Sequence, residues 1–170
     1  MHFLTIAIVL LLNVEPTTSP YRGEETRAIK SLAPEQIDQL LNGRGMGLAK
    51  AAELNSYPGP MHVLALKEEL GLSPEQMAKV QGVFDSMKRN AIDLGKQIVE
   101  AEAALDAAFA KRAIDADQLR TRLRKLGELQ ADLRNAHLVA HLQTRQILSD
   151  RQVAKYDELR GYGAKPAETK

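Results

Sequence analysis

The sequence Leu72-Ser73-Pro74-Glu75-Gln76 and its near copy Leu148-Ser149-Asp150-Arg151-Gln152 frame the stretch that decides the fold. Each phrase holds an apolar residue, a serine, two variable residues and a glutamine. Serine at a helix N-cap accepts a hydrogen bond from a free N–H group of the first turn, and a glutamine three positions later reaches back to the N–H of the cap. The two phrases therefore predict helices that begin just after each serine.

Two weaker copies of the phrase mark further helix starts. One is Leu32-Ala33-Pro34-Glu35-Gln36 and the other is Ile114-Asp115-Ala116-Asp117-Gln118. Proline suits the first helical position, where no N–H group is needed, and aspartate can cap a helix whereas alanine cannot. We expect helices to begin near Pro34 and Ala116.

Between the two serine phrases the apolar residues recur mostly at alternating steps of four and three, the spacing of a packed seam between long helices. We expect one helix from Pro74 to about Lys111 and another from Ala116 to about Ile147. At roughly 1.5 Å per residue they form an antiparallel hairpin about 50 Å long. The seam positions are Val80, Phe84, Met87, Ala91, Leu94, Ile98, Ala101, Leu105 and Ala108, followed by Leu119, Leu123, Leu126, Leu129, Leu133, Ala136 and Ala140.

Short helices are expected on both sides of this hairpin, at about residues 34–42, 48–54, 61–70 and 150–161. Gly71 suits the C-cap of the third. The predicted fold class is therefore all-α. Because a two-helix hairpin buries a single seam and leaves apolar surface over, we expect a homodimer in which a second copy covers that surface.

The N-terminal residues indicate the cell compartment in which the protein works. Residues 3–12 form an apolar run that fits the core of a secretory signal, so residues 1–19 are predicted to be a signal peptide or an N-terminal anchor. Residues 20–60 form a leader with short helices, 61–162 the helical-hairpin domain and 163–170 a disordered tail. The sequence thus predicts an exported protein.

Composition and motifs exclude several classes of function. The net charge of +1, with four tyrosines, three phenylalanines and no tryptophan, argues against nucleic acid as a partner. The absence of cysteine excludes disulfides and thiolate chemistry. Residues 43–47 lack the Lys-Ser/Thr of a phosphate loop, and Leu138 stands where a zinc hydrolase needs a glutamate. We predict that the chain is not an enzyme.

Three histidines support a metal-site hypothesis. His137 and His141 are four residues apart, so their imidazoles project from one face of a helix at a spacing that suits two ligands of one ion. The hairpin places Asp85 opposite residue 141 as a carboxylate, and His62 is expected to fold back over the same end. The alternative is a histidine pair on a solvated face, with Asp85 pairing a histidine or Arg89.

The two serine phrases resemble the Leu-Ser/Thr-x-x-Gln motifs of the Spy/CpxP and heavy-metal-resistor family of bacterial periplasmic proteins. The motif residues are Leu72, Ser73 and Gln76, and then Leu148, Ser149 and Gln152. The order of short helix, long hairpin and short helix is also similar, and the resemblance covers roughly residues 20–162. It implies an all-helical, cradle-shaped dimer in the periplasm.

Members of this family act as ATP-independent chaperones, as stress-signalling modulators or as proteins responsive to zinc, nickel, cobalt or copper. The resemblance implies a protein that binds unfolded clients and requires no cofactor, with metal as an input, or else a metal sensor or buffer that uses the histidines. It also implies unfolded proteins, or a sensor kinase or anti-sigma protein at the inner membrane, as partners. The metal-sensing branch has a His/Met pair late on its third helix, and Thr144 stands near that methionine's place.

Cations that would attract unfolded clients at long range lie on both predicted long helices. The acidic residues interleaved with them leave open the alternative that they only form the solvated face of the helices. The candidate client-binding residues are Lys88, Arg89, Lys96, Arg120 and Arg124.

Overall fold

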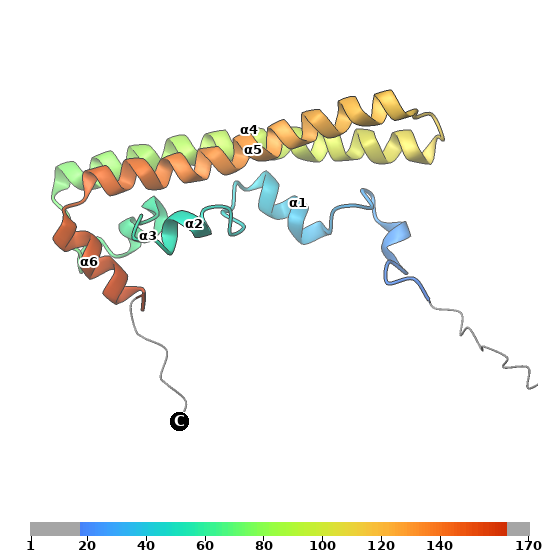
Figure 1. The fold of residues 1–170 in the computed structure, drawn as a ribbon. Coiled ribbons are helices and arrows are strands. Elements are labelled where there is room, and N and C mark those ends of the chain that lie inside the picture. The colour runs from blue at the N-terminus through green and yellow to red at the C-terminus, as the bar shows by residue number, and fades with distance from the viewer. Residues whose placement is uncertain (1–17, 163–170) are drawn as a thin grey trace, which may run out of the picture.

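Two long helices, α4 (Pro74–Ala110) and α5 (Ala116–Ile147), dominate the structure. In this computed structural model, which describes residues 18–162, they run antiparallel and lie side by side (Figure 1). We refer to α4, α5 and their connection as the long hairpin. Both helices begin at the predicted residues and end at or next to the predicted ones.

Short helices flank the long hairpin. The predicted all-α class is confirmed, because the chain from residue 18 to residue 162 contains helices and no strand. None of the helices in this range is long and apolar enough to cross a membrane. Apart from residues 18 and 19, the predicted signal region lies outside the described residues, as does the predicted tail. The flanking elements are the 3-10 turn η1 (Glu24–Thr26), α1 (Pro34–Leu41), α2 (Lys50–Glu53), α3 (Pro60–Ala65) and α6 (Asp150–Leu159).

Hydrogen bonds at the helix starts confirm the predicted caps. At α4, Ser73 Oγ accepts from the N–H of Gln76 at 3.1 Å, and Gln76 Oε1 accepts from the N–H of Ser73 at 3.1 Å. Ser149 and Gln152 make the same two bonds at the start of α6, at 3.3 and 2.9 Å. Asp115 caps α5 through the N–H groups of the first turn.

α3 is shorter than the helix predicted over residues 61–70. It ends at Ala65, and the next residues continue as turns. The N–H of Leu72 donates to Lys67 O and the N–H of Gly71 donates to Glu68 O, both at 3.0 Å, while Gly71 has a φ of 60°. These bonds form a Schellman ending, which favours glycine at the residue of positive φ. Gly71 therefore ends the turns after α3.

The seam of the long hairpin is buried or half-buried at nearly all predicted positions, but the prediction for Leu123 is wrong. This side chain is 50% exposed. Continued from Leu126, the alternating steps of three and four reach Arg122 and Leu119, which are both half-buried. Leu123 lies one position beside that stripe. The same helix also buries three polar residues, namely His137, His141 and Thr144.

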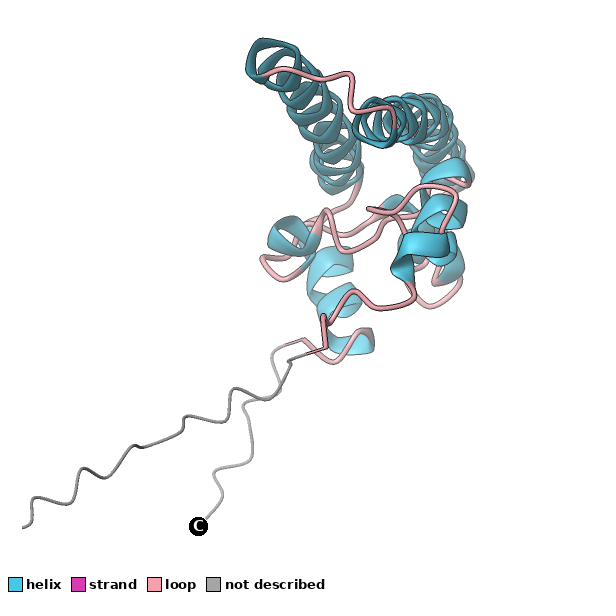
Figure 2. Cartoon of the chain, turned by 90° about the vertical axis from the view of Figure 1, so that its right-hand side faces the viewer, coloured by secondary structure: helices cyan, strands magenta, loops and turns pink. Residues whose placement is uncertain are grey.

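Residues 18–59, which we call the strap, lie along one face of the long hairpin (Figure 1). Figure 2 shows the short helices and their loops on one side of the two long helices. α1 contacts α4, and α2 contacts α5. Leu32, Leu40 and Leu48 of the strap pack against the buried seam. The chain's own strap therefore covers one face, and the homodimer stays a prediction.

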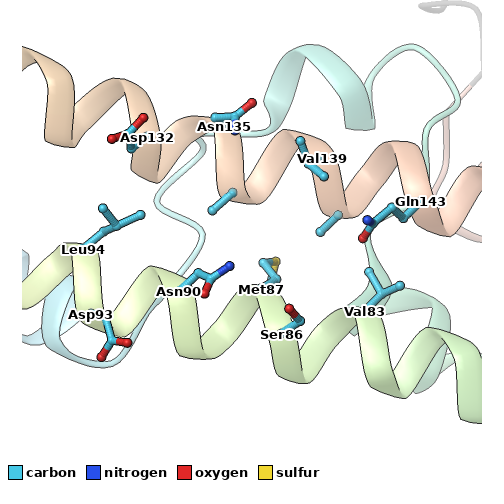
Figure 3. Close-up of a pocket in the computed structure, with 12 residues that line it drawn as sticks. Val83, Ser86, Met87, Asn90, Asp93, Leu94, Asp132, Asn135, Val139 and Gln143 are labelled. Atoms are coloured by element: carbon cyan, nitrogen blue, oxygen red, sulfur yellow. The ribbon is translucent and has the colours of Figure 1, made fainter.

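A groove runs between α4 and α5 and is lined by residues of these two helices alone. Its volume is about 480 Å³. Val83, Met87 and Leu94 of α4 line it together with Val139 of α5, and Asn90 lies between Leu94 and Met87 (Figure 3). Val139 is 37% exposed. We refer to this side of the long hairpin as the free face, because no strap residue lines the groove.

Candidate functional site

A cavity of about 640 Å³ lies between the strap, α3, the long hairpin and the end of α6. It is lined by all three histidines of the described residues, so the structure brings His62, His137 and His141 to one place, as the metal-site hypothesis expected. We call it the histidine cavity. Methionines line it as well, namely Met46 from the strap, Met61 from α3 and Met87 from α4.

His141 is held in place by a hydrogen bond to the backbone of the strap. Its Nδ1 lies 2.7 Å from the carbonyl oxygen of Tyr57. Because a carbonyl only accepts hydrogen bonds, Nδ1 carries a proton and donates it to this bond. A Cβ placed on Gly59 would lie 3.0 Å from His141 Nε2, so a glycine is needed here for the chain to pass over the imidazole.

Burial favours the neutral form of His62 and His137. Burial, and then the neighbouring His141, lower the pKa of His137. Burial, and then the Arg160 guanidinium, lower the pKa of His62. His137 is 3% exposed, and its Nε2 is buried without a hydrogen-bond partner. The histidine pair therefore does not lie on a solvated face.

Asp85 does not lie with the histidines. It is exposed, accepts a hydrogen bond from Gln81 Nε2 at 2.8 Å and does not line the cavity. The carboxylate near His141 belongs to Glu53, whose Oε2 lies 3.8 Å from His141 Nδ1. Within residues 18–162, no three histidine or acidic side chains are placed so that they could hold one metal ion. The residues expected as ligands are therefore not gathered into a metal site in the described part of the chain.

Sequence reasoning missed Glu53, which binds the strap to the C-terminal part of the chain. Its Oε1 accepts from Tyr156 OH at 2.6 Å and from Tyr162 OH at 3.0 Å, and it lies 3.4 Å from Arg160 Nε. Its Oε2 accepts from the N–H of Gly59 at 3.3 Å. Burial and the bond to Glu53 raise the pKa of Tyr156, so its hydroxyl stays protonated and donates. In the sequence, the only sign of these contacts is the turn at residues 56–60, which lets the chain bend back near Glu53.

The two motif glutamines also bind each other. Gln76 Nε2 donates to Gln152 Oε1 at 2.9 Å, and Gln152 Nε2 donates to Gln76 Oε1 at 3.1 Å. Each amide nitrogen donates a second bond, from Gln76 to Ile147 O at 2.9 Å and from Gln152 to Leu70 O at 3.3 Å. We call this arrangement the glutamine clasp. Together with the caps, it satisfies both oxygen lone pairs and both N–H groups of each amide.

The five predicted client-binding cations are all exposed but do not form one cluster. Lys88 lines the histidine cavity, with its Nζ 5.8 Å from the centre of the Phe84 ring. Arg120 Nη1 lies 3.0 Å from Asp117 Oδ1 near the start of α5. Arg89, Lys96 and Arg124 lie at other exposed positions of the two long helices.

Comparison with known proteins identifies one family. A family model described as heavy-metal resistance matches residues 40–155, which is more than half of the 170 residues. The match spans both serine phrases, the long hairpin and all three histidines of the cavity. No curated protein matches the chain, and no solved structure matches it.

Proposed function

Since the chain belongs to the heavy-metal resistance family, we propose that it is a non-enzymatic periplasmic stress protein of Spy/CpxP type that binds exposed apolar segments of unfolded proteins. One observation carries this proposal, namely that the long hairpin holds the strap. The strap has little regular structure, and leucines attach it to an apolar stripe. An unfolded client offers the same chemistry.

Membership of the family also suggests a compartment and further partners for this chain. Proteins of this family are typically periplasmic, and we place this chain in that compartment. A second copy would cover the free face, where Val139 is exposed, and would complete the homodimer. A sensor kinase or anti-sigma protein at the inner membrane is the further partner that this role suggests.

Client binding can be measured with reduced α-lactalbumin, an acidic protein that aggregates when its disulfides are broken. Because this chain contains no cysteine, the reductant acts on the client alone. We expect the purified chain to lower light scattering in near-stoichiometric amounts and without ATP. Added salt should slow client capture, since the proposed long-range attraction is electrostatic.

A matched pair of variants tests the cations. Replacing Lys88, Arg89, Lys96, Arg120 and Arg124 by glutamine should slow the capture of α-lactalbumin. The control removes five cations outside the long hairpin, in Arg22→Gln/Arg27→Gln/Lys67→Gln/Arg151→Gln/Lys155→Gln, and should slow capture less. Scattering that stays the same at any amount of the unmodified chain would rule out the client-binding function.

A second candidate function is metal capture, because three methionines share the cavity with the histidines. Thioether and imidazole ligands favour Cu(I), whereas zinc sites use thiolate, imidazole and carboxylate. His137 supplies a buried nitrogen without a partner. Of the metals that the family resemblance implies, we therefore propose copper in its monovalent state.

Titration with Cu(I), competed by a chelator of known affinity, tests this candidate beside Zn²⁺ and Ni²⁺. We expect one Cu(I) per chain, and a loss of affinity in Met46→Leu/Met61→Leu/Met87→Leu, which conserves side-chain volume. Met77→Leu is the control, because Met77 does not line the cavity. Equal Cu(I) affinity in both variants would remove the methionines from the site.

A further inference from the structure

We propose that residues 18–42 of the strap form a displaceable cover that occupies the client-binding face of the long hairpin. This inference rests on the client binding proposed above and adds its regulation. The chain's own segment competes with clients, so the apolar stripe becomes available only when the cover leaves.

The two ends of the strap are attached in different ways. Its last residues are fixed by polar contacts to α5 and α6, through Glu53 to Tyr156, Tyr57 O to His141 and Ser56 Oγ to Asp157. The cover has weaker polar contacts near the connection of the hairpin. There Lys30 Nζ lies 3.1 Å from Asp106 Oδ2, and Ser31 Oγ donates to Glu102 Oε2 at 2.8 Å. Lys30 and Ser31 are both exposed.

A glycine-rich segment separates the cover from the fixed end. In Gly43-Arg44-Gly45-Met46-Gly47, positive φ values of 57°, 47° and 74° occur at Gly43, Met46 and Gly47. This segment joins α1 to α2. The only regular elements of the cover are η1 and α1, of three and eight residues. Helices this short are not stable alone, so the cover can detach and unfold while the long hairpin keeps its own seam.

α4 is shaped to receive the cover at Gly95. A Cβ on this residue would lie 2.1 Å from the carbonyl oxygen of Leu40 and 2.7 Å from its carbonyl carbon. Glycine is unfavourable in the interior of a helix. At residue 95 its missing side chain lets the backbone of α1 touch α4. Leu32 and Leu40 of the cover, eight residues apart, then pack on the seam. The client that fits this stripe is an unfolded segment with similarly spaced leucines.

The addition of one methyl group at residue 95 tests whether the cover can be displaced. Gly95→Ala should displace the cover, because the added Cβ meets backbone atoms that cannot turn aside. Gly82→Ala is the matched control, since it is the same change in the same helix and its Cβ would meet nothing within 4 Å. We expect trypsin to cleave after Lys30 and Arg44 at least about tenfold faster in Gly95→Ala than in Gly82→Ala, as local opening predicts.

The aggregation of reduced α-lactalbumin then measures whether the apolar stripe is available to a client. Gly95→Ala should halve the light scattering at a several-fold lower concentration than the unmodified chain, and Gly82→Ala should match the unmodified chain. Faster cleavage without better suppression would overturn the inference and leave the proposed function standing. Unchanged cleavage would show that Gly95 does not hold the cover, and would also overturn it. Absence of suppression in all three proteins would instead refute client binding itself.

A second variant avoids the buried seam, in case Gly95→Ala fails to fold. Lys30→Glu places two carboxylates together at Asp106 and should speed cleavage after Arg44 about two- to fivefold, as for an exposed ion pair. Adding Asp106→Lys restores the opposite charges and should restore both cleavage and suppression. If the double variant stays open, the ion pair does not fasten the cover and the proposed attachment at this end is wrong.

Discussion

Glu53→Ala is expected to lower the free energy of unfolding by about 3 kcal/mol, the size typical of removing one partner from a buried charged network. The carboxylate is 13% exposed and accepts bonds from two tyrosine hydroxyls and one backbone N–H group. Alanine would leave the buried hydroxyl of Tyr156 and the guanidinium of Arg160 without this partner. For a chain of this size, the thermal midpoint should fall by roughly 6–10 °C.

Two further variants separate the causes of this loss. Glu53→Gln keeps an oxygen that can accept from Tyr156 but removes the charge opposite Arg160, so it should recover part of the stability. Glu75→Ala removes an exposed carboxylate whose ion pair is with Lys79 and should change the thermal midpoint little. A Glu53→Ala midpoint equal to that of Glu75→Ala would contradict the role of Glu53 as the anchor of the strap.

The parts of the fold that depend on neighbouring residues could be predicted from the sequence. A cap needs residues within three positions, and a seam needs a repeat of three and four. For these reasons α4, α5 and α6 begin where Ser73, Asp115 and Ser149 predict. Leu123 shows the limit of the pattern, because an apolar residue beside the true stripe looks the same in the sequence.

The parts that depend on distant residues could not be predicted. Tyr156 and Glu53 are 103 residues apart, and no local pattern connects them. Asp85 was expected opposite His141, but counting from the turn gives a level along the hairpin and not the direction of the side chain around α4. The burial of the histidines depends on the strap, whose path over α5 is set by contacts such as that between Gly59 and His141.

The glutamine clasp explains why a capping phrase occurs twice in this chain. Capping alone uses the glutamine oxygen and leaves the amide nitrogen free. Here the nitrogen of each glutamine reaches the other phrase, so the start of α4 is joined directly to the start of α6. Both long helices meet at this end of the hairpin, and the clasp therefore fixes the register between them.

Gln76→Ala and Gln152→Ala should each lower the free energy of unfolding by about 2 kcal/mol, because the partly buried carbonyls of Ile147 and Leu70 and the opposite amide lose their partners. Ser73→Ala removes only the local cap and should cost about 1 kcal/mol. The double variant Gln76→Ala/Gln152→Ala should cost about 3 kcal/mol, less than the sum, because the two glutamines share bonds. Denaturant unfolding of the four variants measures this coupling. If the two single losses add fully, the glutamines act only as separate caps and do not join α4 to α6.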